Sequence, residues 1–104
     1  MLIEDYYIIY NPVSGNKQSS NRIKKLSNDL DIRNKTYKIT KTENAGHAKK
    51  ICEALKHYKN LIIIGGDGTF NEAINGLMLN QQYSPKVGFI PGGTGNSLMH
   101  DLEG

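Results

Sequence analysis

The chain has 104 residues, of which 38% are hydrophobic and 22% are charged, and its formal net charge at pH 7 is +3. This composition is typical of one soluble globular domain. No apolar run approaches the ~20 residues that a membrane-spanning helix needs. The basic residues are scattered among acidic ones, which argues against a nucleic-acid partner, although the small cationic surplus can attract a polyphosphate or an anionic membrane surface.

Cysteine content and the start of the chain both indicate a cytoplasmic location. The single cysteine, Cys52, cannot form an internal disulfide and suits a reducing compartment. The first residues include Glu4 and Asp5 and lack the apolar segment of a signal peptide.

The first two thirds of the chain alternate between apolar strands and amphipathic helices. A run of β-branched and aromatic residues predicts the first strand, and apolar residues three and four positions apart predict each helix. In chain order, we expect a strand over Tyr6–Tyr10, a loop over Asn11–Lys17, a helix from about Ser19 to Leu30, a strand over Lys35–Thr40, a helix from about Ala45 to Tyr58 and a buried strand over Leu61–Ile64.

The best-marked helix is predicted over Thr69–Met78. Thr69 and Glu72 have the spacing of a capping box, in which each side chain accepts a hydrogen bond from the other residue's backbone N–H. This pattern would start the helix immediately after a run of glycines. A strand over Lys86–Ile90 follows, and a last helix is expected to begin at Asn96 or Ser97.

The alternating order of strands and helices predicts an α/β fold. Specifically, it predicts a three-layer, Rossmann-like parallel sheet with helices on both faces. Ligands of such sheets bind beyond the carboxyl ends of the strands. The loops that begin at Asn11, Gly65 and Pro91 all follow predicted strands, so we expect them at that same edge.

Two glycine-rich loops directly follow predicted strands. The first reads Gly65-Gly66-Asp67-Gly68-Thr69, and the second reads Pro91-Gly92-Gly93-Thr94-Gly95-Asn96. Glycine tolerates φ > 0 and, without a Cβ, lets backbone N–H groups approach a phosphate. Neither loop matches the Walker A pattern or the G-x-G-x-x-G dinucleotide fingerprint. The pair therefore predicts a nucleotide site of another kind, suited to phosphoryl transfer.

Asp67 is the most informative residue of the first loop. A carboxylate within a phosphate cradle repels its ligand unless a cation or a proton lies between them. We therefore expect Asp67 to organise Mg²⁺ near the phosphates, or to accept a proton from the attacking hydroxyl. In the second loop, Thr94 and Asn96 offer side-chain donors. The structural alternatives are a turn aspartate at Asp67 and a helix N-cap at Asn96.

These motifs, taken in order, resemble the diacylglycerol kinase catalytic domain, the family of diacylglycerol, sphingosine, ceramide and related bacterial lipid kinases. The segment Gly65–Leu77 is highly specific, whereas Gly-Gly-Asp-Gly alone is shared with NAD kinases and phosphofructokinases. The resemblance covers nearly the whole chain and rests on Asn11-Pro12-x-Ser14-Gly15, Gly46-His47-Ala48, Gly65–Leu77 and Pro91–Asn96.

The resemblance implies an ATP-dependent kinase that uses Mg²⁺ and phosphorylates a lipid hydroxyl group. Asp67 would be its catalytic and metal-binding residue. Ser97 stands where many bacterial members have an aspartate, and the nearest acid, Asp101, is given a substrate-side role. The residues implied to bind ATP are Asn11, Thr42, Gly65, Gly66, Gly68, Thr69, Asn71, Gly93, Thr94 and Asn96.

Family members also carry a second, β-rich domain with an acidic residue that acts as general base. The resemblance therefore implies that residues 1–104 form the N-terminal nucleotide-binding domain of such a kinase, without that second domain. A lipid substrate implies peripheral contact with a membrane, and an exposed sheet edge leaves room for a homo-oligomer. Two alternatives stay open: an NAD-kinase-type enzyme, and a non-catalytic nucleotide-binding module.

Overall fold

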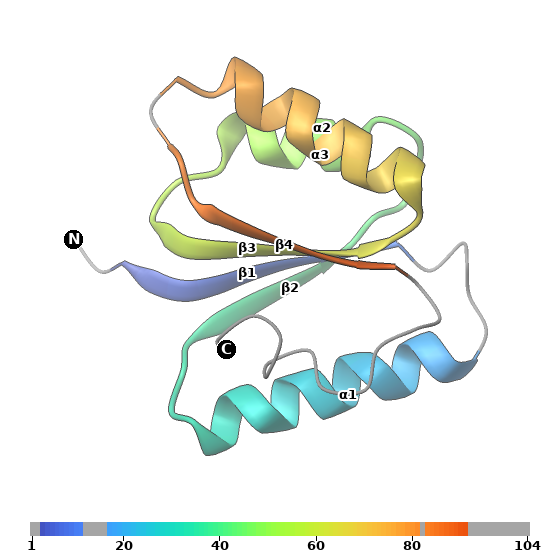
Figure 1. Cartoon of the computed structure of the whole chain (residues 1–104), viewed down its shortest axis with the longest axis vertical. Coiled ribbons are helices and arrows are strands. Elements are labelled where there is room, and N and C mark those ends of the chain that lie inside the picture. Colours follow the sequence, from blue (N-terminus) through green and yellow to red (C-terminus); the bar gives the residue numbers. More distant parts are fainter. Residues whose placement is uncertain (1–2, 12–16, 82, 92–104) are drawn as a thin grey trace.

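The computed structural model describes residues 3–11, 17–81 and 83–91, which form a four-stranded parallel sheet with helices on both faces (Figure 1). The predicted α/β, three-layer arrangement is confirmed. The elements in chain order are β1 (Glu4–Tyr10), α1 (Lys17–Ile32), β2 (Tyr37–Lys41), α2 (His47–Ala54), β3 (Tyr58–Gly65), α3 (Asp67–Leu79) and β4 (Lys86–Pro91). The last predicted helix, at Asn96 or Ser97, lies outside the described residues.

Several predicted element boundaries differ from the structure, among them those of the second and third helices. The second helix ends at Ala54 rather than near Tyr58, because the chain becomes extended at Leu55 and turns through a positive φ of 73° at His57. Tyr58 instead begins β3, where its ring packs edge-on against Tyr7 with the ring centroids 4.9 Å apart. The third helix begins at Asp67, two residues before the predicted start.

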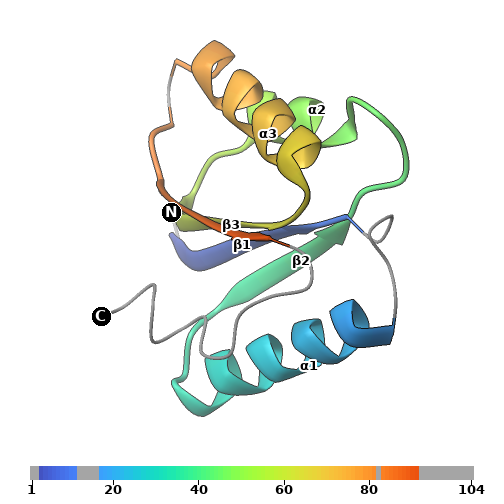
Figure 2. The ribbon, with the colours of Figure 1, turned by 45° about the vertical axis from the view of Figure 1, so that its right-hand side comes forward.

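The strand order β2-β1-β3-β4 places β1 and β3 at the centre of the sheet. The chain moves to one side of β1 to form β2 and then crosses to the other side to form β3. Right-handed crossovers therefore place α1 on one face and both α2 and α3 on the other, as the rotated view shows (Figure 2). The point where the strand order reverses lies between β1 and β3, and ligands of open α/β sheets bind at such a point.

Each face of the sheet has its own apolar core, because alternate side chains along a strand point to opposite faces. On one face, the strand residues Tyr6, Ile8, Ile62 and Ile64 pack against two residues of α1, Leu26 and Leu30. Their neighbours in sequence pack against α2 and α3; the buried members of this second core are Tyr7, Ile9, Ala48, Cys52, Leu55, Leu61, Ile63 and Ala73.

Cys52 is a core residue, as the sequence predicted. Its side chain is fully buried on α2, and this burial raises the pKa of the thiol to about 12. The thiol therefore stays neutral and behaves as a small apolar group.

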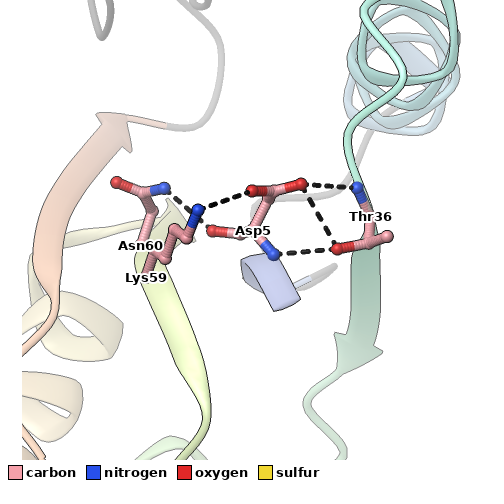
Figure 3. Close-up of polar contacts among 4 residues, drawn as sticks. All are labelled: Asp5, Thr36, Lys59 and Asn60. Carbon is pink, nitrogen blue, oxygen red and sulfur yellow. Dashed lines mark hydrogen bonds and ion pairs between the residues drawn. The ribbon is translucent and has the colours of Figure 1, made fainter. Parts of the chain in front are cut away.

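Asp5 links β1 to β3 and to Thr36, the residue just before β2, at the amino edge of the sheet (Figure 3). Its carboxylate accepts a hydrogen bond from the Thr36 backbone N–H at 3.0 Å, and Lys59 Nζ lies 3.6 Å from its other oxygen. Asn60 donates to the Asp5 carbonyl at 2.8 Å. The Thr36 N–H, helped by the Lys59 charge, holds the pKa of Asp5 below its usual 3.8.

Within the part of the chain that the structure describes, no helix combines the length and the apolar character that crossing a membrane requires.

Candidate nucleotide site

At the carboxyl edge of the sheet, β1 and β2 end level with each other and β3 continues for one more residue. Tyr10 of β1 pairs with Lys41 of β2 and with Ile64 of β3. The residues that follow these three positions, Asn11, Thr42 and Gly65, therefore emerge side by side. The sequence placed the Asn11 and Gly65 loops at one edge, and the register confirms this.

A cavity of about 440 Å³ opens at this edge, where β1 and β3 adjoin. Five of the predicted nucleotide-binding residues line it: Asn11, Thr42, Gly66, Gly68 and Thr69. The other lining residues are Glu43, Asn44, Ala45, Ala48 and Glu72. The cavity lies between two walls, the β2–α2 loop (residues 42–46) and the turn from β3 into α3 (residues 65–69).

Asn11 and Thr69 contact each other directly across the two central strands. The Asn11 side-chain amide donates a 2.7 Å hydrogen bond to Thr69 Oγ1. Gly65 makes this contact possible, because a Cβ at that position would lie 3.1 Å from Asn11 Cβ and 3.2 Å from Thr69 Oγ1. Gly65 is buried beneath the pair and does not line the cavity.

Gly66 and Gly68 are not needed for a left-handed backbone conformation. Gly66 has a φ of −91°, and the described glycine with a positive φ is Gly46, at 85°. The expectation that the first glycine loop needs φ > 0 is therefore wrong. A Cβ at Gly66 or Gly68 would meet no atom within 4 Å, so both leave open space where a ligand can approach the backbone. The remaining reason for glycine at these positions is that a ligand can come close to the backbone.

The predicted capping box is not formed. The N-cap of α3 is Gly66, which has no side-chain cap, and the first helical bond runs from Phe70 N–H to the Gly66 carbonyl at 3.2 Å. Thr69 instead accepts from Asn11, and Glu72 accepts from the Gly46 backbone N–H at 3.0 Å. Both side chains are used for contacts between elements rather than within the helix.

Asp67 is the first residue of α3 and is exposed between the two cavity-lining glycines. The first N–H groups of a helix have no partner inside it and carry partial positive charge, so this end of α3 suits an anion. Among the described residues no three histidine, cysteine or acidic side chains gather as metal ligands. The absence of such a cluster is compatible with Mg²⁺, because this ion is held through only one or two carboxylates, together with substrate phosphates and water.

The structure describes only one further residue of the predicted nucleotide-binding set, and it does not bring that residue to the cavity. Asn71 is exposed on α3 and is not among the lining residues. Gly93, Thr94, Asn96 and Asp101 lie outside the described residues.

In the β2–α2 loop, sequence patterns identified Thr42 as a ligand residue and Gly46 as part of a family motif. They missed the cavity-lining residues Glu43, Asn44 and Ala45. The Thr42 N–H donates to the Tyr10 carbonyl at 2.8 Å, and the Glu43 N–H donates to His47 Nδ1 at 3.0 Å. Glu43 and Asn44 carry no motif of their own. The available signal was their place directly after a strand that ends at the ligand-binding edge.

Known proteins resemble this chain over nearly its whole length. The family model of the diacylglycerol kinase catalytic domain matches residues 5–104. A protein of Streptococcus pneumoniae serotype 4 named "Putative lipid kinase" is 37% identical over 98 residues, which cover 92% of this chain and 33% of that protein. Sphingosine kinase B of Dictyostelium discoideum is 36% identical over 101 residues, which cover 91% of this chain and 13% of that kinase.

The fold is also similar to that of a solved structure. A protein from Bacillus anthracis str. Sterne, described as "a putative diacylglycerol kinase", superposes with a TM-score of 0.68 at 30% identity, over 99% of this chain and 35% of the other. The chain thus spans about a third of the length of that structure and of the streptococcal relative.

Proposed function

The chain belongs to the diacylglycerol kinase catalytic domain family, and we propose that it forms the ATP-binding domain of a lipid kinase that transfers the γ-phosphate of ATP to a lipid hydroxyl group. One observation carries the proposal. Asn11, Thr42, Gly66, Gly68 and Thr69, which come from three separate segments of the sequence, line a single cavity at the point where the strand order reverses.

The nucleotide phosphates are proposed to lie against the start of α3. Gly66 and Gly68 leave space for them to approach the backbone, and the helix dipole favours their negative charge. Asn11 and Thr69 are held together by their hydrogen bond and would present a fixed polar surface to the ligand. Phosphoryl transfer depends mainly on such positioning and on charge neutralisation.

Asp67 is proposed to organise the metal. The described lining residues include the carboxylates of Glu43 and Glu72 and no lysine or arginine, so a polyphosphate here requires a cation. Bound Mg²⁺ would supply positive charge that lets a carboxylate and phosphate oxygens share one site. We propose that the Asp67 carboxylate holds this ion, because it is exposed at the helix start between two glycines that line the cavity, although Asp67 itself is not a lining residue.

The second substrate is proposed to be a lipid alcohol, presented at a membrane surface. The family and the names of the relatives support a lipid kinase. We propose that residues 1–104 bind the nucleotide and that other residues of the kinase bind the lipid.

The proposal is tested by calorimetric titration of the purified protein, at the full length its gene encodes, with Mg·ATP and in parallel with NAD. We expect saturable binding of ATP and none of NAD. Binding of NAD together with its phosphorylation would instead identify an NAD-kinase-type enzyme. Binding of ATP without transfer to any lipid alcohol would identify a nucleotide-binding module.

Asp67→Asn tests the assigned role of the carboxylate. We expect kcat/KM for lipid phosphorylation to fall by about 100-fold or more, because charge neutralisation at the transferred phosphate is lost, while the melting temperature changes little for an exposed side chain. Glu53→Gln is the matched control, since Glu53 is an exposed carboxylate on α2 that does not line the cavity. Equal activity in the two variants would refute the role of Asp67.

A further inference from the structure

The β2–α2 loop is held to the rest of the site by one side chain from α3. Glu72 Oε1 accepts the backbone N–H of Gly46 at 3.0 Å, and the two residues are 26 positions apart in sequence. Gly46 is the corner where the loop turns into α2: it is the N-cap of that helix, with a φ of 85° and no side-chain cap. The Glu72 carboxylate therefore satisfies an N–H at the start of α2 that no local group caps.

The other hydrogen bonds of the β2–α2 loop do not reach the opposite wall of the cavity. The Thr42 N–H donates to the Tyr10 carbonyl of β1, and the Glu43 N–H donates to Nδ1 of His47, the first residue of α2. Glu72 differs because it lies on α3, one helical turn after Gly68 and Thr69 of the opposite wall. Its hydrogen bond joins the two walls of the cavity.

We propose that Glu72 is a positioning residue that sets the separation of the two cavity walls and so determines nucleotide affinity through Gly46. This inference rests on the proposed nucleotide site and concerns a residue that the sequence assigned only to helix capping. The hydrogen-bonding oxygen is what matters in this role, because an amide oxygen at the same place can accept the same N–H.

Two substitutions separate this role from a direct contact with metal or phosphate. Glu72→Ala removes the acceptor, whereas Glu72→Gln keeps an acceptor of the same reach and removes the charge. We expect Glu72→Ala to weaken Mg·ATP binding about tenfold, the effect of one lost hydrogen bond to a charged group. Glu72→Gln should bind no more than about threefold more weakly than the wild type. In the kinase assay, KM for ATP should rise in the alanine variant while kcat changes less than about twofold.

Amide hydrogen exchange at Gly46 gives a readout that does not depend on ligand or activity. In the protein without nucleotide, the Gly46 N–H should exchange about tenfold faster in Glu72→Ala than in the wild type and should stay protected in Glu72→Gln. Glu53→Ala, which removes an exposed carboxylate from α2 away from the cavity, should change neither exchange nor affinity.

The outcomes are distinct. Equal loss of affinity in the glutamine and alanine variants would overturn the proposal in favour of a charge-dependent contact. Unchanged affinity in the alanine variant would also overturn it. Wild-type protein that binds no Mg·ATP would refute the proposed function, and this inference with it, whatever the exchange rates show.

Discussion

Neighbouring glycines at the end of β3 are required for different reasons. Gly65 is buried, and a Cβ there would lie only 3.1 Å from Asn11 Cβ and 3.2 Å from Thr69 Oγ1, which is closer than ordinary van der Waals contact. Gly66 is exposed and lines the cavity, with no atom within 4 Å of a Cβ built on it. The first glycine therefore serves the fold, and the second leaves room for a ligand.

Alanine substitutions at these two positions should separate stability from binding. Gly65→Ala pushes against two side chains that are tied to each other, and we expect it to lower the free energy of unfolding by about 1–2 kcal/mol. Gly66→Ala adopts an allowed extended backbone, so stability should stay the same or rise by up to ~1 kcal/mol, while Mg·ATP affinity falls about tenfold. Urea denaturation and calorimetry check the pair, and a reversed pattern would contradict the assignment.

Helices α2 and α3 approach each other closely at Gly76. A Cβ there would lie 2.4 Å from the Lys49 carbonyl oxygen and 2.8 Å from Cys52 Cβ. The first of these is backbone of the facing helix, so it cannot move without shifting α2 as a whole. At this point α2 and α3 therefore pack together with no side chain between them. Helix α3 carries Glu72, and α2 begins directly after the β2–α2 loop.

Gly76→Ala should destabilise the protein despite the better helix propensity of alanine. We expect the free energy of unfolding to fall by about 2–3 kcal/mol, because overpacking against the backbone outweighs the ~1 kcal/mol that alanine gains in a helix. Asn75→Ala is the matched control, since Asn75 is exposed on the same helix. Urea denaturation that gave the two variants the same stability would show that α2 yields at this contact.

Across the whole molecule, the two edges of the sheet use polar groups in opposite ways. At the amino edge, Asp5 is paired with groups from neighbouring strands, including Thr36, Lys59 and Asn60 (Figure 3). At the carboxyl edge, polar residues surround an open cavity. The polar contacts at the amino edge stabilise the pairing of the strands, whereas the cavity at the carboxyl edge is available to a ligand.

The Asp5 contacts should make stability depend on pH. The pKa of Asp5 is lowered in the folded state, so its contribution is complete above 3.8, the usual value, and is lost as the pH falls through the lower folded value. Asp5→Ala should cost about 1–2 kcal/mol at pH 6, and the difference from wild type should shrink toward pH 2. Urea denaturation at several pH values measures this, with Glu53→Ala as control. A difference that stayed constant with pH would show that the charge of Asp5 is irrelevant.

Sequence patterns predicted the strands, the helices and the loops between them, but not the hydrogen bonds between residues far apart in the sequence. The apolar run ending at Ile64 and the glycines after it were enough to place a loop at the ligand-binding edge. The capping box failed because Thr69 and Glu72 bond instead to Asn11 and Gly46, which are 58 and 26 residues away. Periodicity and local spacing carry no information on such partners.

The pairing of Asn11 with Thr69 has a consequence for how this protein folds. Parallel strands become neighbours only after a crossover, so contacts between β1 and the end of β3 require long loops to close, at a cost in conformational entropy. The residues that line the cavity extend from Asn11 to Glu72, so no short segment of the chain can form the cavity by itself. Any ligand that occupies it therefore binds only the complete sheet and, at a concentration of 100 times its Kd, would add about 2.7 kcal/mol to global stability.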